Sequence, residues 1–350
     1  MQKLFYKDSS LIGLDIGSND MKLMAIAPDK WTVLAHGAID VDSVKMRKSL
    51  DNDGEYLKLR LKRLLLDKLH GNLPSTQVAV SIPTSRTYSR TFSIPATAKK
   101  NLKEAIELEV SQYIPVPITL LYVDYEIIHE TKDALDVLVS AAPKVVVDNI
   151  IDACAQAGLT VNLVEPSINS IARILQSTES GTLPTAIIDI GSVTTDVAIL
   201  EKGIIRVTGS TATGGNAFTL NIAKKLNVSI ENAHQLKILN GLNVGPRQKK
   251  ITAALESNLK KISLEARRVM RYYNERVQGE KVEQVIIVGG GSNVPGIGEY
   301  FTNELTMPAR VASPWQRLNF GKLEQPAKQL RPRYIGVAGV ATITKEEVLE

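Results

Sequence analysis

The sequence predicts an α/β fold of two lobes related by duplication, and three observations support this prediction. The tetrapeptide Asp-Ile-Gly-Ser occurs at residues 15–18 and again at 189–192, each time directly after an apolar run. Asp15 and Asp189 lie 174 residues apart (189 − 15), which is too long for a solenoid repeat and suits two matching halves. A cluster of three glycines at 289–291 follows another apolar run late in the chain.

The first lobe is expected over residues 1–76. Short apolar runs predict strands at residues 11–16, 21–26 and 31–39, which would form a sheet around the first tetrapeptide. Residues 56–69 place leucines at mostly helical spacing among Lys and Arg, so an amphipathic helix should cover this sheet. Gly71 and Pro74 end the helix.

An inserted αβ subdomain is expected over residues 77–164. A helix carries Leu102, Ile106, Val110 and Tyr113 and stops at the prolines that follow. The other expected elements are strands at 78–82, 88–94, 123–128, 137–141 and 160–164 and a helix at 145–157. Residues 165–184 are expected to return to the first lobe.

The second lobe is expected over residues 185–340, with a tail at 341–350. Its strands are predicted at 186–190, 196–200, 204–207 and 285–288, and its helices at 217–226, 232–239, 251–277 and from about Pro295. The long helix has Lys260, Lys261 and three arginines on one side. We interpret these basic residues as a solvated face in preference to a binding patch.

The composition excludes several classes of protein. The net charge of +5 is spread along the chain without a basic tract of the kind that follows nucleic acid, so no nucleic-acid partner is expected. The single Cys154 cannot form an internal disulfide, and the four histidines lack zinc-ligand spacing. Neither a signal peptide nor a membrane span is evident, so we expect a cytoplasmic protein that reaches a membrane only through a partner.

The first tetrapeptide has the character of an anion-binding turn. A strand that ends in Asp15 and turns at Gly17 brings backbone N–H groups close to an anion. Ser18, Asn19 and Lys22 could then offer a hydroxyl, an amide and an ammonium group to a phosphate. The alternative is that Lys22 is an ordinary exposed lysine on the returning strand.

The second tetrapeptide repeats this arrangement. Gly191 is followed by three hydroxyl side chains, those of Ser192, Thr194 and Thr195. Hydroxyl groups beside the carboxylate of Asp189 suit a phosphate only if a cation lies between them, and Mg²⁺ bridges carboxylate and phosphate through its waters. We therefore expect Asp15 and Asp189 to flank one Mg²⁺ and to contact it through water. A threonine-rich strand is the structural alternative.

Two glycine clusters complete the pattern. Gly214 and Gly215 precede a predicted helix, whose first N–H groups could donate hydrogen bonds to phosphate or ribose oxygens. The cluster of Gly289, Gly290, Gly291 and Ser292 follows a buried strand, where glycines would let a flat base lie against the backbone. This cluster is not a Rossmann fingerprint, because Val294 stands where the third glycine should be. No segment of the sequence matches a Walker A loop either.

Together, these turns resemble the phosphate 1, phosphate 2 and adenosine motifs of the actin/Hsp70/sugar kinase superfamily. The resemblance covers both halves of the chain. It implies an actin-like (ribonuclease H-like) two-lobed fold that closes on ATP and Mg²⁺, with the inserted αβ segment as a 1C-type subdomain. The residues that match the phosphate loops are Asp15, Gly17, Ser18, Asn19, Lys22, Asp189, Gly191, Ser192, Thr194 and Thr195.

Within this superfamily the chain looks most similar to the PilM family of type IV pilus assembly, a relative of the FtsA division family. The matching runs are residues 13–18, residues 107–115 with Asp124 and Tyr125 after them, and residues 333–338. FtsA proteins typically end in a linker and an amphipathic membrane helix. The short acidic end at residues 344–350 therefore favours the PilM branch.

The resemblance also implies partners and a location. PilM-like proteins bind ATP and hold the cytoplasmic N-terminal tail of the membrane protein PilN, which links the pilus alignment complex to its motor. The same is expected here: a cytoplasmic scaffold, peripheral to the inner membrane through a PilN-like partner, with pilus motor components as further partners. Self-association and the choice between pilus, secretion and competence pathways stay open. No motif marks the peptide groove, which we expect at the boundary between the inserted subdomain and the first lobe.

Two positions have open alternatives. Lys237 is a candidate for ribose contact, although its sequence neighbours are His234 and Glu231 rather than an adjacent acid. Glu165 and Asp189 are the catalytic candidates, and a carboxylate at a helix N-terminus is the favoured alternative for Glu165. The sequence contains clear phosphate-binding groups, but the residue that would serve as the base is ambiguous. We therefore expect slow ATPase activity or none. The rival functions are an FtsA-like filament protein and a small-molecule kinase, which would need a base aimed at an acceptor hydroxyl.

Overall fold

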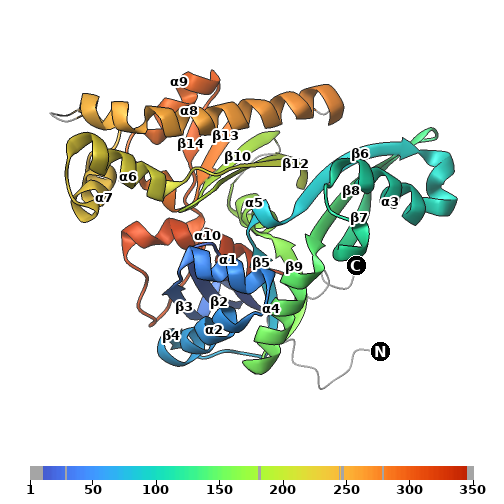
Figure 1. The fold of residues 1–350 in the computed structure, drawn as a ribbon, viewed down its shortest axis with the longest axis horizontal. Helices are drawn as coiled ribbons and strands as arrows, with labels where there is room; N and C mark the ends of the chain where they lie inside the picture. The colour runs from blue at the N-terminus through green and yellow to red at the C-terminus, as the bar shows by residue number, and fades with distance from the viewer. Residues whose placement is uncertain are drawn as a thin grey trace.

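The computed structural model describes residues 11–27, 30–179, 183–243, 245, 248–277 and 280–344. It confirms the α/β prediction, because helices cover two sheets that lie in separate lobes (Figure 1). The first sheet has the order β4-β3-β2-β1-β5-β9 and the second β14-β13-β10-β11-β12-β6-β8-β7. Residues 1–10 of the expected first lobe and residues 345–350 of the expected tail lie outside the described residues.

The first sheet is built around the strand that ends in the first tetrapeptide. Its central strand β1 pairs antiparallel with β2 and parallel with β5. After the inserted segment the chain returns, and β9 pairs in parallel with β5. The strands are β1 (Ile12–Ile16), β2 (Asp20–Ala27), β3 (Thr32–Asp40), β4 (Leu69–Gly71), β5 (Gln77–Ile82) and β9 (Thr160–Pro166).

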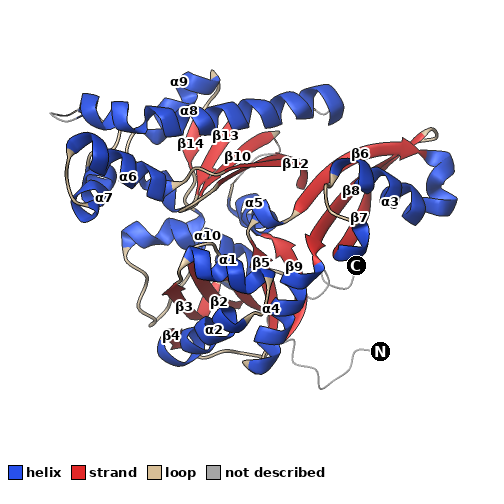
Figure 2. Ribbon diagram, in the orientation of Figure 1, coloured by secondary structure: helices blue, strands red, loops and turns tan. Residues whose placement is uncertain are grey.

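Helices cover both faces of this sheet (Figure 2). One face packs on α1 (Ser43–Asp51), α2 (Glu55–Asp67) and α4 (Lys144–Gln156), and the other on α5 (Ser167–Thr178) and α10 (Ile335–Val340). The sequence did not reveal α1, which begins where Asp42 accepts hydrogen bonds from the N–H groups of Val44 and Lys45. It did not reveal α10 either, since six residues are too few to show helical periodicity.

The inserted segment is shorter than the sequence predicted. Strands β5 and β9 pair with the first sheet, and α4 packs on α1 and α2, so these three elements belong to the first lobe. The insertion therefore spans residues 84–143, which we call the inserted module. Its elements are η2 (Thr84–Arg86), β6 (Tyr88–Pro95), η3 (Ala96–Asn101), α3 (Leu102–Tyr113), η4 (Ile118–Leu120), β7 (Leu121–Glu130) and β8 (Ala134–Pro143).

The second lobe holds the other tetrapeptide at the end of β10, which pairs antiparallel with β11 and parallel with β13. Its long helix buries one apolar face, while Lys260, Arg267 and Arg268 on its outer side form ion pairs with glutamates. The strands are β10 (Thr185–Ile190), β11 (Thr195–Glu201), β12 (Ile204–Thr211), β13 (Gln284–Val288) and β14 (Ala309–Val311). The helices are α6 (Gly215–Leu226), α7 (Ile230–Leu239), α8 (Gln248–Tyr272) with a π turn η5 (Tyr273–Val277), η6 (Gly290–Asn293) and α9 (Ile297–Leu305).

The chain returns to the first lobe after β14. Two short helical segments, η7 (Pro314–Arg317) and η8 (Lys328–Tyr334), lead into α10. Trp315, Phe320 and Tyr334 pack with α5 in one apolar cluster, so the returning segment is held to the first lobe. No helix in the described ranges has both the length and the apolar character needed to cross a bilayer.

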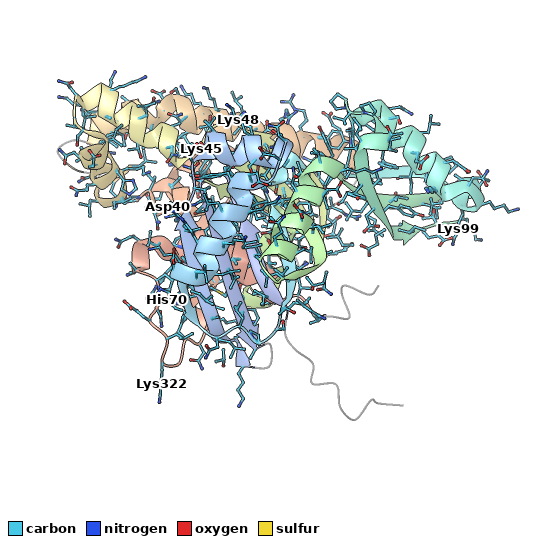
Figure 3. All side chains as sticks on the ribbon, turned by 60° about the horizontal axis from the view of Figure 1, so that its bottom comes forward. Asp40, Lys45, Lys48, His70, Lys99 and Lys322 are labelled. Carbon is cyan, nitrogen blue, oxygen red and sulfur yellow. The ribbon has the colours of Figure 1, made fainter. Side chains whose placement is uncertain are left out.

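A buried histidine on β3 makes stability depend on pH. His36 is 4% exposed, its Nε2 lies 2.8 Å from the carbonyl oxygen of Glu324, and its ring stacks on that of His70, on the outside of the lobe (Figure 3). Burial lowers the pKa of His36 below 6.5, and the adjacent His70 lowers it further. Below pH 6.5 the unfolded chain therefore binds a proton that the folded chain excludes, and stability is lost as the pH falls.

We expect the urea midpoint of wild type to fall relative to that of His36→Gln as the pH is lowered from 7.5 to 5.5. Other titrating groups contribute equally to both proteins, so the difference between the two midpoints isolates His36. Glutamine keeps a hydrogen-bond donor for the Glu324 carbonyl but does not titrate. His129→Gln, in the inserted module, is the control and should keep the wild-type pH dependence. Equal slopes for wild type and His36→Gln would contradict this account.

Candidate functional site

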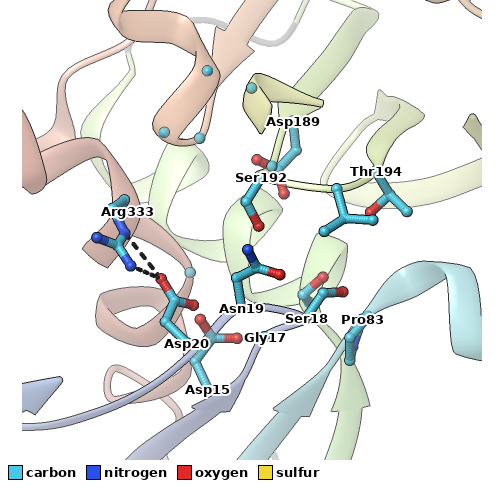
Figure 4. A pocket seen from close by; sticks show the side chains of 18 of the residues that line it. Asp15, Gly17, Ser18, Asn19, Asp20, Pro83, Asp189, Ser192, Thr194 and Arg333 are labelled. Atoms are coloured by element: carbon cyan, nitrogen blue, oxygen red, sulfur yellow. Dashed lines mark hydrogen bonds and ion pairs between the residues drawn. The ribbon is translucent and has the colours of Figure 1, made fainter. Parts of the chain in front are cut away.

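A cleft of about 420 Å³ lies between the two lobes, and both tetrapeptides line it (Figure 4). Its volume falls in the range of ordinary small-molecule sites, roughly 300–1,000 Å³. The predicted site residues in its lining are Asp15, Gly17, Ser18, Asn19, Lys22, Asp189, Gly191, Ser192, Thr194, Gly215, Lys237, Gly289, Gly290 and Gly291. Thr195, Gly214, Ser292 and Glu165 are not in it.

The first turn is closed by a backbone hydrogen bond and leaves donors facing the cleft. The N–H of Gly17 donates to the carbonyl oxygen of Asp20 over 2.9 Å. Among the residues that the structure describes, no acceptor is found for the N–H groups of Ser18 and Asn19, and Asn19 Oδ1 is buried without a partner. A buried polar atom without a partner costs free energy, so this turn suits a polar ligand.

Lys22 is neither exposed nor free. Its side chain is 5% exposed, and its Nζ lies 3.0 Å from Asp15 Oδ2 and 2.5 Å from Asp20 Oδ1. Burial opposes the charge, but the two carboxylates hold the pKa of Lys22 above its ordinary value. The exposed alternative is thus wrong, and the charge of Lys22 is already balanced by protein carboxylates.

Asp15 is positioned by the two strands beside β1. Lys22 stands opposite it on β2 and Ser81 on β5, and the Ser81 hydroxyl donates to Asp15 Oδ1 over 2.8 Å. Asp15 is 8% exposed and so presents little of its carboxylate to a ligand. A contact between Asp15 and a metal would therefore run through water.

Asp20 and Arg333 belong to the site although the sequence analysis did not select them. The guanidinium of Arg333 donates to Asp20 Oδ2 over 2.9 and 2.6 Å and to Asp40 over 2.9 Å. Burial disfavours ionised Asp20, yet Lys22 and Arg333 hold its pKa below the ordinary value. Asp20 and Arg333 are 313 residues apart, so no local pattern could have paired them.

The second turn is closed by the same kind of backbone hydrogen bond as the first. The N–H of Gly191 donates to the carbonyl oxygen of Thr194 over 3.0 Å, and the side chains of Ser192 and Thr194 face the first turn across the cleft (Figure 4). Thr195 differs from the prediction, because its fully buried hydroxyl donates to the carbonyl of Thr213 over 2.7 Å. Thr195 fixes the turn and is not available to a ligand.

Asp189 is the carboxylate that lacks a partner. No described residue donates a hydrogen bond to it, and Asp196 stands opposite it on β11. Burial, and then the charges of Asp196 and Asp15, raise the pKa of Asp189 to about 7. Burial also raises the pKa of Asp196 to about 6, although the Ser210 hydroxyl donates to it. A cation would relieve this repulsion.

The acidic groups do not make a complete metal site by themselves. Within the described residues, no group of three His, Cys, Asp or Glu side chains is arranged to hold a metal ion. Mg²⁺ commonly takes one or two carboxylates and completes its shell with water and ligand phosphates. The carboxylates of Asp189 and Asp15 fit that kind of site.

Gly214 and Gly215 have a different role from the one predicted. The N–H groups of Gly215 and Asn216 at the start of α6 donate to the carbonyl oxygens of Gly191 and Ser192, each over 2.9 Å. These donors are therefore already used by the second turn. A Cβ on Gly214 would lie 2.7 Å from the Gly191 oxygen, so glycine allows the helix to support the turn at close range.

Lys237 is a buried ammonium group beside Gly215 in the lining of the cleft. It is 6% exposed, and Nζ donates to the carbonyl of Gly215 over 3.0 Å and to the Thr219 hydroxyl over 2.9 Å. Burial lowers the pKa of Lys237 to about 8, and no described carboxylate pairs with it. His234, one turn earlier on α7, also lines the cleft. This part of the cleft therefore holds a cation that an electronegative ligand atom would stabilise.

The glycine turn after β13 closes the same side of the cleft. Gly289 has φ +82°, and a Cβ there would lie 2.2 Å from Asp189 Oδ1, so only glycine fits beside that carboxylate. Gly290 lies against the Arg333 side chain. Ser292 faces away from the cleft, because its hydroxyl donates to the carbonyl of Gly289 over 2.7 Å. It supports the turn.

Glu165 lies outside the cleft and directly before Pro166, the N-cap of α5, where the favoured alternative placed it. It is 6% exposed in β9, and both of its carboxylate oxygens accept hydrogen bonds of 2.8 Å from the guanidinium of Arg173 on α5. A carboxylate held by two charged donors and outside the cleft cannot activate water there. The ion pair joins β9 to α5.

Two lobes that face each other through matching Asp-Ile-Gly-Ser turns define an actin-like protein. Comparison with known sequences agrees, because the family model described as type IV pilus assembly protein PilM matches residues 13–343. The chain belongs to this family.

Known structures and relatives are consistent with this assignment. A solved PilM-PilN type IV pilus biogenesis complex is 20% identical, with a TM-score of 0.78 over 96% of this chain and 98% of that chain. MreB5 of Spiroplasma citri bound to ADP is 14% identical, with a TM-score of 0.51 over 94% of each chain. Ethanolamine utilization protein EutJ of Escherichia coli strain K12 is 28% identical over 154 residues, 44% of this chain. The chain spans about half the length of the EutJ relatives that it matches.

Proposed function

We propose that this chain binds Mg·ATP between its lobes and acts as a cytoplasmic scaffold of type IV pilus assembly, holding the N-terminal tail of a PilN-like membrane protein. The observation that carries the proposal is the pair of matching turns, each closed by a glycine N–H, which face each other in one cleft. MreB5, which shares the fold, has been solved with ADP.

The phosphates would lie between the two turns. The N–H groups of Ser18 and Asn19 and the hydroxyls of Ser192 and Thr194 are the donors that face this space. Lys22 contributes less than its charge suggests, because Asp15 and Asp20 already neutralise it. Backbone and hydroxyl donors therefore bind the phosphates in this proposal.

Mg²⁺ would lie beside Asp189, with Asp15 behind a water molecule. Asp189 is the better ligand because no described residue hydrogen-bonds to it and because neighbouring carboxylates disfavour its charge. The metal would supply the positive charge that makes a triphosphate compatible with this acidic corner. The unpartnered Asn19 Oδ1 can accept a hydrogen bond from a metal-bound water.

The nucleoside would lie toward Lys237 and the glycine turn at residues 289–291. Replacing Lys237 with methionine is expected to weaken Mg·ATP binding roughly tenfold or more, since a hydrogen bond from a charged donor is lost. The same change should leave the unliganded protein at least as stable, because it removes a buried charge without a counter-ion.

Thermal unfolding with and without Mg·ATP measures both effects for Lys237→Met. The matched control is Lys224→Met on the exposed side of α6, which should retain the full nucleotide-dependent shift. A Lys237→Met protein that is stabilised by nucleotide as much as the wild type would rule out this placement of the nucleoside.

Catalysis is expected to be slow or absent. Hydrolysis needs a base that orients water as well as groups that hold the phosphates. Glu165 is bound to Arg173, and Asp189 is assigned to the metal, so neither of the two predicted candidates is free to act as the base. Calorimetric titration with Mg·ATP, followed by phosphate release assays, tests binding and turnover separately. Binding without rapid turnover supports a scaffold, whereas fast transfer to a small acceptor would favour a kinase.

The partner peptide would bind where the inserted module meets the first lobe. β7 is the edge strand of the second sheet, so its outer backbone groups can pair with an extended peptide. Tyr122 on β7 is half exposed and donates to Asp148 on α4, and Val145 on α4 is also exposed. These residues combine aromatic and apolar contacts with an acidic side chain next to an open strand edge.

Capture by the first twenty or so residues of a PilN-like protein tests this role. Retention of the purified full chain on that immobilised peptide supports the proposal, and loss of capture in Tyr122→Ala would assign the surface. Pelleting with protein-free liposomes would instead favour an FtsA-like function. Binding to pilus motor components and a location at the inner membrane follow from the same proposal and are tested with those components present. Self-association is a separate question that the proposal does not decide.

A further inference from the structure

The inserted module is attached to the two lobes in different ways. The chain enters it from β5 and leaves it into α4, both in the first lobe. Its sheet, however, continues the sheet of the second lobe, because β6 lies next to β12 with Val207 opposite Arg90 (Figure 1). The Thr208 hydroxyl also donates to the carbonyl of Ser89 over 3.3 Å. The module is thus covalently part of one lobe and hydrogen-bonded to the other.

Arg90 on β6 contacts residues on both sides of the boundary between the module and the second lobe. Its guanidinium lies between two tyrosine rings, 3.9 Å from the ring centre of Tyr113 on α3 and 4.5 Å from that of Tyr272 at the end of α8. Its Nε donates to the Tyr272 hydroxyl over 2.6 Å. One side chain therefore joins the helix and strand of the module to the long helix of the second lobe, through cation–π contacts and a hydrogen bond.

Apart from the crossing at Thr84, the side-chain bonds between the module and the first lobe lie at the surface, and they include an ion pair between Arg86 of η2 and Asp51 of α1. The module has its own apolar cluster around Ile106 and Val137, separate from the cluster of the first lobe. The side-chain bonds between Tyr122 and Asp148 and between Lys144 and the carbonyl of Thr119 are exposed to solvent. Exposed bonds of this kind contribute little rigidity.

The entry to the module also touches the cleft. Pro83, the residue between β5 and η2, lines the cleft together with Ser167. The Thr84 hydroxyl lies 3.1 Å from the Ser167 hydroxyl and accepts a hydrogen bond from the N–H of Ile168. A short, well-anchored crossing at this point can act as the hinge about which the module turns.

We propose that the inserted module moves with the second lobe, so that closure of the cleft changes the spacing between β7 of the module and α4 of the first lobe. Arg90 is the positioning residue that makes the module follow. This inference rests on the proposed function and deepens it, since it states how nucleotide would regulate the surface that binds the partner. The regulation is a coupling between two sites and must be reciprocal.

Distance measurements between fluorescent labels test the motion without any partner. Cysteines replace three exposed lysines in pairs: Lys132 at the tip of the module, Lys62 on α2 and Lys225 on α6. The native Cys154 is buried, and burial raises its pKa to about 12, so it reacts poorly with labels. On addition of Mg·ATP we expect the distance from 132 to 62 to change and that from 132 to 225 to stay constant.

A second experiment measures the coupling. The affinity of the full chain for the PilN-like N-terminal peptide is determined with and without Mg·ATP, and a difference of about 5- to 150-fold is expected for wild type. In Arg90→Ala this difference should shrink to about twofold or less, while Mg·ATP itself binds as before. Tyr272→Phe keeps the ring and loses only the hydroxyl, so it should give an intermediate loss.

Lys99→Ala is the matched control, because Lys99 pairs with Glu130 inside the module, far from the second lobe (Figure 3). It should keep the wild-type coupling. If nucleotide brings residues 62 and 225 closer but the module stays with residue 62, the inference is overturned and the proposed function stands. Full coupling in Arg90→Ala would also overturn it. Absence of any nucleotide binding would overturn the proposed function and the inference with it.

Discussion

Replacing Asp189 with asparagine is expected to weaken Mg·ATP binding by roughly 10- to 100-fold, the range seen when groups that orient a metal shell are removed. The reason is electrostatic. Asp189 is the carboxylate in the cleft that no described residue hydrogen-bonds, and neighbouring acids raise its pKa to about 7. A magnesium ion is the partner that would let Asp189 ionise. Removal of the Asp189 carboxylate should therefore weaken nucleotide binding most when magnesium is present.

The magnesium dependence makes this prediction specific. In EDTA, Asp189→Asn should bind ATP as well as wild type or better, because a carboxylate that repels the triphosphate has been removed. Calorimetric titrations of both proteins, with and without magnesium, give the four affinities. If Asp189→Asn weakens ATP binding equally with and without magnesium, the Asp189 side chain affects binding by supporting the structure of the cleft, and the proposed metal site is wrong.

Replacing Gly339 with alanine is expected to lower the free energy of unfolding by about 3 kcal/mol, the upper end of the usual cost of overpacking. Gly339 lies in α10 where this helix crosses α5, and a Cβ there would stand 1.9 Å from the carbonyl oxygen of Ser170. The obstacle is backbone, so no side-chain rotation can relieve it. The two helices must move apart.

Urea unfolding followed by circular dichroism measures the effect of Gly339→Ala. Gly245→Ala is the matched control, because among the described residues its Cβ would meet no atom within 4 Å, and its stability should stay within about 0.5 kcal/mol of wild type. A Gly339→Ala protein as stable as this control would show that the helix crossing adapts easily.

Much of the local structure could be predicted from the sequence. Apolar runs located β1 and β10, and the leucine spacing located α2, because these patterns reflect burial on one element. Pairing across the sheet could not be predicted in the same way. The inserted segment was therefore placed at 77–164, although β5 and β9 pair with the first sheet and leave 84–143 as the module.

The candidate site likewise contains residues that the sequence revealed and residues that it did not. Residues of the two turns were recognised because glycine and hydroxyl groups after a buried aspartate are a local pattern. Arg333 was missed because its partner Asp20 is 313 residues away, and the burial of Lys22 was missed because it depends on both of them. The ion pair of Glu165 was missed because its partner Arg173 lies on the next helix and leaves no sequence signal.

The sequence by itself determined the duplicated α/β organisation and the two phosphate-type turns, since periodicity and glycine placement are properties of neighbouring residues. Only the tertiary structure decided which charges are already paired, which donors remain free and which sheet the strands of the inserted module join. Those outcomes depend on contacts between residues far apart in the chain, and the free energy of a buried charge is set by all the groups around it.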